Sequence, residues 1–327
     1  MRDIYPHANT VVCIEESKLL KRLEYEILYN TKNLRATLNE LNDINYFHTY
    51  KNADPDNYAI MLDGLTKATF GLMKEIAPDP LIWRIFALYY DIHNMKLAVK
   101  ERILRERLEK YFLDYGSYPM QQIRSATVRE SDDILRDKTL TRGLFDALRQ
   151  KEMQEIDFIL DKTYFRVLKE MSERFEIPEI VEFVTDRIDL YNFSCCFQSR
   201  AMGSPEGYFE KAFSECGSRP LQEWLEYISG SRPKGFENFT LWKKFFPEAK
   251  YAGYQTELSM RFDVLADNYL INKTKVCKLS AFGIEPICAY FFNKLIEIKN
   301  IRILLMGKEN DFASDEIIKR MRIPYEL

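Results

Sequence analysis

The stretch PICAYFFNKLIEIKNIRILLMGK, residues 286–308, decides the fold, because its polar residues recur with the same spacing twice earlier in the chain. In each copy an acidic residue follows a proline by eleven positions, an asparagine follows three later, and a base follows eight beyond that. Internal repeats of this kind dictate architecture. The copies are Pro80–Asp91–Asn94–Arg102, Pro178–Asp189–Asn192–Arg200 and Pro286–Glu297–Asn300–Lys308.

The spacing places the repeated residues along one side of a helix. Eleven residues at about 100° each end roughly 20° beyond three full turns, so proline, acid and base form one polar stripe with the asparagine beside it. In one interpretation, the acid and asparagine hydrogen-bond a neighbouring helix and fix each sector internally. In the other, the three stripes line a common surface that grips a partner. We favour the first, because buried polar groups are usually satisfied internally.

Helical periodicity extends over most of the chain, and no segment alternates as a strand does. The repeat also reaches upstream, since Leu62-Asp63, Leu160-Asp161 and Ala266-Asp267 precede the three prolines by 17, 17 and 19 residues. We therefore predict an all-α fold of three similar sectors, residues 1–116, 117–203 and 204–327. Residues 117–136 are expected to be mixed and 229–239 to form an exposed loop. Helices are expected at 15–40, 58–76, 80–116, 142–150, 157–175, 178–203, 221–228, 241–245, 254–272, 286–307 and 314–321.

Composition excludes several classes of function. The net charge of −3 gives no electrostatic footprint for nucleic acid. No run of 18 apolar residues exists to span a bilayer, and the first residues carry no signal-peptide core. The six cysteines form no CxxC pair, and the three histidines are far apart. We expect a cytoplasmic protein without cofactor or metal.

One acidic segment suggests an alternative. Asp132, Asp133 and Asp137 resemble the aspartate-rich magnesium motif of all-helical prenyl-transferring enzymes, although the spacing differs by one residue. Asp133 and Asp137 would share a helix face, but one pair of carboxylates holds magnesium weakly. A magnesium-dependent helical enzyme is one alternative, and a generic helical-repeat adaptor is another. Phosphate-binding glycine loops and a GxSxG nucleophile motif are absent.

Several segments resemble a known family. The sequence is similar to the C subunit of bacterial and archaeal V/A-type rotary ATPases, the counterpart of the eukaryotic d subunit, most specifically near its end. The segments that carry the resemblance are Gly283–Pro286, Ala289-Tyr290, Lys294, Glu297–Arg302, Gly307-Lys308, Ile318–Arg322, Tyr325 and, in the second sector, Ile156–Phe165.

This resemblance implies a funnel-shaped, all-helical protein with pseudo-three-fold symmetry and no catalytic residue. It would lie on the cytoplasmic face of the membrane rotor (proteolipid) ring, without inserting into the membrane. It would receive the base of the central shaft, which is made of the D and F subunits. Its role would be to transmit torque between ATP hydrolysis or synthesis and ion translocation.

Overall fold

The computed structural model describes residues 5–47, 54–129, 135–199, 204–231, 234–245, 252–279 and 283–326. Within these ranges the predicted all-α fold is confirmed, since the chain contains helices and no strand. The chain divides into two compact units. Unit 1 combines residues 1–83 with 263–327, and unit 2 is residues 84–262.

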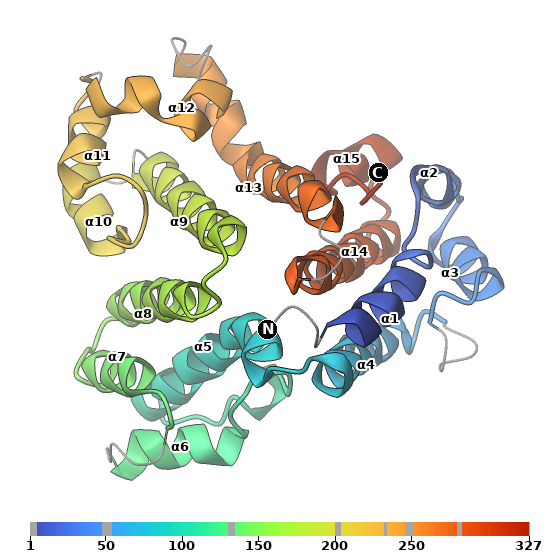
Figure 1. The fold of residues 1–327 in the computed structure, drawn as a ribbon, viewed down its shortest axis with the longest axis horizontal. Helices are drawn as coiled ribbons and strands as arrows, with labels where there is room; N and C mark the ends of the chain where they lie inside the picture. Colours follow the sequence, from blue (N-terminus) through green and yellow to red (C-terminus); the bar gives the residue numbers. More distant parts are fainter. Residues whose placement is uncertain are drawn as a thin grey trace. The chain divides into compact units, whose positions relative to one another are not determined.

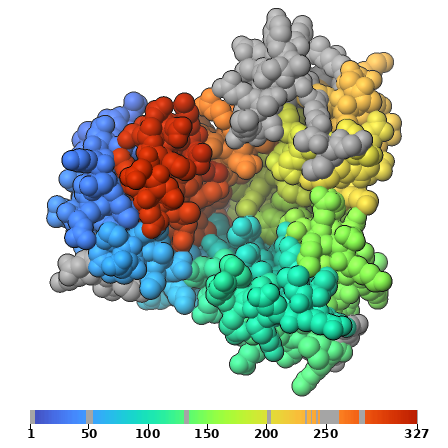
Figure 2. All heavy atoms as spheres, turned by 180° about the vertical axis from the view of Figure 1, so that it is seen from behind, coloured from blue at the N-terminus to red at the C-terminus, as the bar shows by residue number. Residues whose placement is uncertain are grey.

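Unit 1 is built around α14 (Glu285–Glu309), which packs against α1 (Pro6–Glu16), α3 (Leu34–Asp43) and α4 (Tyr58–Ile76) (Figure 1). A helix that is apolar on most sides is a core helix, and α14 buries residues on nearly every face. Figure 2 shows the last part of the chain (red) against the first (blue). The core of unit 1 therefore joins distant segments of the sequence, among them Leu20, Leu28, Leu41, Leu62, Leu65, Ile301, Leu304 and Ile317.

In unit 2, α7 (Lys138–Leu148) lies beside α6 (Met120–Arg129) and α8 (Met153–Glu173), and α8 packs on α9 (Pro178–Ser199) (Figure 1). Local sequence explains α7, because Asp137 accepts a hydrogen bond from the backbone N–H of Leu140 (3.0 Å) as N-cap.

A second part of the unit 2 core is rich in aromatic residues. It forms where α9 meets α10 (Pro205–Ala212), α11 (Leu221–Ile228) and α12 (Thr240–Phe245). The ring of Trp224 is fully buried, and its centroid lies 4.6 Å from that of Phe193 in an edge-to-face arrangement.

The predicted helix over residues 15–40 is wrong, because the chain breaks it twice. Between α1 and α2 (Arg22–Tyr29), the backbone N–H of Leu20 donates to Glu297 of α14 instead of to a helical carbonyl. Before α3, the side chain of Asn33 accepts from the N–H of Ala36 and starts a new helix. In both places a non-helical hydrogen bond overrides the periodic pattern.

The predicted end of the long helix from Pro80 is also wrong. α5 (Pro80–Leu104) ends where Arg105 takes a left-handed conformation with φ of 54°, and only the 3-10 turn η2 (Glu109–Tyr111) follows. A carboxylate oxygen of Glu101 accepts from the N–H of Leu108 (2.7 Å), which holds the chain in its turn.

The exposed loop expected at 229–239 is wrong in its second half. Residues 229–231 are exposed, but η3 (Lys234–Asn238) follows and Phe236 is fully buried against Trp224. The segment 117–136, expected to be mixed, contains α6 between the non-helical residues 117–119 and 135–136, and its residues 130–134 lie outside the described residues. Helix α10 was not predicted, and the predicted end of the second long helix, at 203, lies outside the described residues. The other predicted helices agree to within a few residues and include α13 (Ala252–Thr274) and α15 (Ser314–Arg320).

Candidate functional site

The three repeated prolines lie at the beginnings of the three long helices. Pro80 and Pro178 are the first residues of α5 and α9, and Pro286 is the second residue of α14. Proline suits these positions because the first helical N–H groups have no intrahelical acceptor. Before α5, the side chain of Asp79 accepts from the N–H of Leu81 (2.8 Å). The repeat therefore begins at a defined helix start.

The three repeated asparagines are buried and make the same pair of hydrogen bonds, which we call the asparagine clamp. In each copy the amide Nδ2 donates to a backbone carbonyl, and the amide Oδ1 accepts from the N–H of that same residue. Each clamp thus ties a long helix to the segment that returns after it. The pairs are Asn94 with Leu113 (2.7 and 3.0 Å), Asn192 with Ser214 (3.0 and 2.9 Å) and Asn300 with Arg322 (3.0 and 2.9 Å).

The first two repeated acids hold a glycine–serine turn three residues beyond each clamp. Asp91 Oδ1 accepts from the N–H groups of Ser117 (2.7 Å) and Tyr118 (3.1 Å). Asp189 Oδ1 accepts from the N–H of Ser218 (2.9 Å). In both turns a glycine precedes the serine, because a Cβ there would overlap the carboxylate oxygen. The turns read Gly116-Ser117-Tyr118-Pro119 and Gly217-Ser218-Arg219-Pro220, a repeat that could have been found in the sequence.

The third acid is a glutamate and uses a different donor. Glu297 Oε2 accepts from the N–H of Leu20 (2.6 Å), which precedes α2. Its other oxygen, Oε1, pairs with Lys294 Nζ at 2.6 Å, and both side chains are less than one-tenth exposed. The N-terminal segment therefore supplies in this copy the contact that a glycine–serine turn supplies in the other two.

Burial changes the titration of the two aspartates. Burial raises the pKa of Asp91 from its ordinary value of 3.8 to about 6, although hydrogen bonds from Tyr118 and Ser117 oppose the change. Burial likewise raises the pKa of Asp189 to about 6, against hydrogen bonds from Ser218. Both carboxyl groups thus take up a proton more readily in the folded protein than in the unfolded chain.

This shift predicts a pH dependence of stability. A carboxyl group whose pKa is higher in the folded protein stabilises the fold at pH values below the pKa that it has in the unfolded chain. That contribution is lost as pH rises through the folded-state pKa of about 6. Relative to the Asp91→Asn variant, we expect the unfolding free energy of the protein to fall by about 2 kcal/mol between about pH 4 and pH 7. Urea unfolding of both proteins across this range measures the difference. The control is Asp146→Asn, which removes an exposed carboxyl group. If the unfolding free energies of Asp91→Asn and of the parent protein change in parallel with pH, the expectation is wrong.

The repeated bases bond to carbonyl groups near the ends of short helices. Arg102 Nη1 donates to the carbonyl of Thr127, in the last turn of α6 (2.8 Å). Lys308 Nζ donates to the carbonyls of Tyr29 (2.9 Å) and Thr31 (2.7 Å), at the end of α2. A cation there satisfies carbonyls that lack a helical donor. Arg200, the third base, lies outside the described residues.

The acids that precede each proline also enter ion pairs between helices. Lys96 of α5 pairs with Asp161 of α8 (2.7 Å), and Arg302 of α14 pairs with Asp63 of α4 (2.8 Å). Lys96 and Arg302 each lie sixteen residues after the proline of their copy. The same contact therefore recurs within unit 2 and within unit 1. Asp267, the third acid, pairs instead with Lys299 and Arg322.

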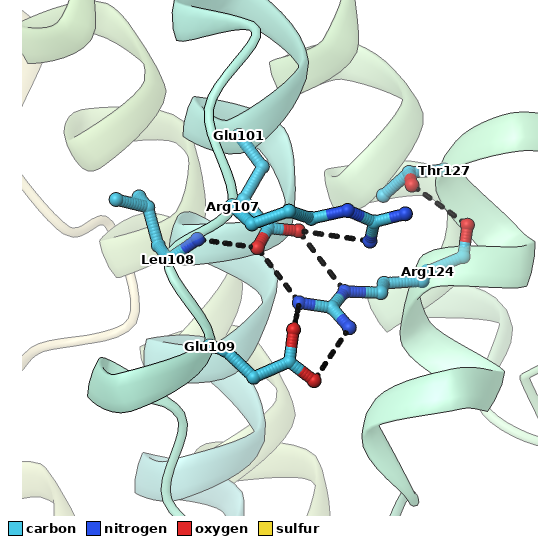
Figure 3. A network of polar contacts seen from close by, with 6 residues as sticks. All are labelled: Glu101, Arg107, Leu108, Glu109, Arg124 and Thr127. Atoms are coloured by element: carbon cyan, nitrogen blue, oxygen red, sulfur yellow. Dashed lines mark hydrogen bonds and ion pairs between the residues drawn. The ribbon is translucent and has the colours of Figure 1, made fainter.

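Sequence reasoning missed a polar network beside the first clamp (Figure 3). Arg124 of α6 donates through Nε and Nη2 to Glu101 of α5 (3.0 and 2.7 Å) and through Nη1 and Nη2 to Glu109 (3.2 and 2.8 Å). The Arg107 side chain lies 3.9 Å from Glu101. Such bidentate hydrogen bonds between a guanidinium and a carboxylate add geometric specificity to charge attraction. The network fixes α6 against the end of α5.

The structure gives little support to the alternative of a magnesium site. Asp137 is engaged as the N-cap of α7, and Asp132 and Asp133 lie outside the described residues. In the described ranges no three His, Cys, Asp or Glu side chains gather closely enough to hold a metal ion. Among the same residues, no helix combines the length and the hydropathy of a membrane span. The described residues of the repeated stripe are hydrogen-bonded to the chain's own backbone. The division of the chain into three sectors stays a prediction.

Comparison with known proteins gives full-length matches. The family model described as "ATP synthase (C/AC39) subunit" matches residues 8–320. The chain is 26% identical to the C subunit of the V-type sodium ATPase of Enterococcus hirae, over 99% of both chains. It is 23% identical to the C subunit of the A-type ATP synthase of Methanocaldococcus jannaschii, over 96% of this chain and 85% of that one. The protein of the same name from Methanosarcina acetivorans is also 23% identical, over 96% and 91%.

Proposed function

The chain belongs to the ATP synthase (C/AC39) subunit family, and from this premise we propose that it is the non-catalytic rotor component that links the central shaft to the membrane ring. It is a subunit of a V/A-type rotary ATPase. The shaft partners would be the D and F subunits, and the ring partner the proteolipid rotor. The protein would be peripheral at the cytoplasmic face of the membrane and would transmit torque for ion translocation.

The observation that carries this proposal is the match over nearly the whole chain to relatives of similar length. A relative matched from end to end shares its architecture, whereas a local motif can be shared by unrelated folds. The stripe residues support the same role in physical terms. Because their buried polar atoms bond to the protein's own backbone, they serve stiffness, and a torque-bearing part must be stiff. Close packing in protein interiors transmits strain in this way.

A binding experiment and a coupling experiment test the proposal. The purified chain is mixed with a purified D–F complex and passed over a size-exclusion column, where we expect co-elution. In membrane vesicles that carry the whole ATPase without this protein, we expect ATP hydrolysis without ion transport, and we expect added protein to restore transport. Separate elution from D–F, or ion transport that persists without the protein, would rule out the linking role.

A further inference from the structure

The segments that lead from the ends of α5 and α14 to the clamp partners Leu113 and Arg322 begin with the same backbone conformation and then differ. Arg105 and Asp311 lie 25 residues after the prolines of their copies, and both have a left-handed φ of 54°. After Asp311 the chain forms α15 before it reaches its clamp partner, 22 residues beyond Asn300. After Arg105 it forms only η2 and reaches its clamp partner 19 residues beyond Asn94. The first copy is three residues shorter and has no counterpart of α15.

In the C-terminal copy, α15 covers the corner between the end of α14 and the end of α2. Ile317 of α15 is buried and packs on Gly307, where a Cβ would lie only 2.6 Å from Ile317 Cγ1. Ser314 Oγ donates to the carbonyl of Tyr29 (2.8 Å) and lies 3.3 Å from Lys308 Nζ. A short helix with one buried isoleucine thus closes this corner.

In the first copy the equivalent corner is an open groove of about 580 Å³ between the ends of α5 and α6. Ala98, Glu101 and Arg102 line it, and they hold the positions of Leu304, Gly307 and Lys308 in their copy. From α6 the groove is lined by the C-terminal residues, including Val128, which is 78% exposed. Val128 is thus the exposed apolar side chain among the residues that line the groove.

The groove is positively charged. We name it the arginine groove after the five arginines among its lining residues, Arg102, Arg105, Arg107, Arg124 and Arg129.

Only two carboxylates, Glu101 and Glu106, also line the arginine groove. Glu101 is occupied by Arg124 and by the N–H of Leu108 (Figure 3). Arg105 and Arg129 are exposed, and the side chain of Arg107 is 73% exposed. The charge of the groove is therefore complementary to an acidic partner.

We propose that the arginine groove docks a short acidic amphipathic helix of another protein, in the place that α15 takes in the C-terminal copy. An apolar residue of that helix would cover Val128 and Ala98. Its carboxylates would face Arg105, Arg107 and Arg129. The floor carries Glu101 where the other copy has glycine, so the helix lies further out than α15 does and relies more on charge. The inference rests on the comparison of two copies within this chain and does not depend on the proposed rotor function.

The probe is a fluorescent, hydrocarbon-stapled peptide with the sequence of residues 314–320 in which Lys319→Glu and Arg320→Glu make it acidic. Fluorescence anisotropy with the full chain measures its Kd, and we expect saturable binding that weakens with salt. The double variant Arg105→Asp with Arg129→Glu is expected to weaken binding at least about tenfold, or about 1.4 kcal/mol. The first substitution is compatible with the fold, because Asp311 takes the same conformation in the other copy.

The controls separate charge from fold and from simple anion binding. The double variant Arg142→Glu with Arg149→Glu makes the same change of charge at exposed positions in and directly after α7. It should leave Kd within about twofold, as expected of surface sites outside the contact. A peptide with Ile317→Ser should bind more weakly, because it lacks the apolar contact. The proposal would be overturned if the peptide shows no saturable binding or if the double variant Arg105→Asp with Arg129→Glu has an unchanged Kd. It would also be overturned if millimolar inorganic phosphate displaces the peptide fully, since the groove would then be only an anion site. Loss of D–F binding with intact peptide binding would refute the rotor function alone.

Discussion

Replacing Glu297 by alanine is expected to lower the free energy of unfolding by about 3 to 5 kcal/mol. The substitution leaves the ammonium group of Lys294 buried without its carboxylate and leaves the N–H of Leu20 without its acceptor. An uncompensated buried charge is among the most costly single defects in a protein core. Urea unfolding followed by circular dichroism measures the loss.

The matched control removes both charges. Because apolar residues of similar volume can replace a buried ion pair at little cost, the double variant Lys294→Met with Glu297→Leu should be more stable than Glu297→Ala. The remaining loss should be that of the single hydrogen bond from Leu20, about 1 to 3 kcal/mol. A double variant less stable than Glu297→Ala would show that the charge of Lys294 is not the source of the cost.

Asn300→Leu is expected to lower the unfolding free energy by about 2 to 5 kcal/mol while changing D–F binding less. Leucine has a similar volume, but it leaves the N–H and the carbonyl of Arg322 unsatisfied in a buried place. Each unsatisfied buried group costs about 1 to 3 kcal/mol. Thermal melts beside D–F binding curves compare the two effects.

Asn310→Leu is the control, because Asn310 lies one residue beyond the same helix and its exposed amide donates only to the carbonyl of Met306 (2.8 Å). It should change stability by no more than about 1 kcal/mol, because exposed carbonyls can bond to water instead. An unchanged melt with lost D–F binding for Asn300→Leu would mean that the asparagine belongs to a partner surface and not to an internal clamp.

Much of the helical layout could be predicted from the sequence, because apolar spacing is a local property. The predicted bounds 58–76 and 221–228 agree with α4 and α11 residue for residue. The prediction fails where a distant group decides the local conformation. The chain leaves the helix near Leu20 because Glu297 takes its N–H, and a one-dimensional pattern contains no sign of a contact 277 residues away.

For the candidate site, too, the sequence predicts local features but not contacts with distant residues. The stripe of asparagines and acids could be found because identical side chains recur at identical spacing. Their partners could not be read directly, since the clamps bind backbone atoms of Leu113, Ser214 and Arg322. Any residue except proline offers the same N–H and carbonyl groups there. The paired Gly-Ser-x-Pro turns were the remaining local signal.

The bond between Leu20 and Glu297 also constrains the order of events during synthesis. Unit 2 is one continuous segment, so a ribosome delivers all of it before the last part of unit 1 exists. The first 83 residues must wait for α14, since their core includes Ile301 and Leu304. Closing so long a loop is entropically costly and slow. We therefore expect residues 1–83 to keep apolar side chains exposed until α14 has been synthesised, so that their folding is coupled to the arrival of α14.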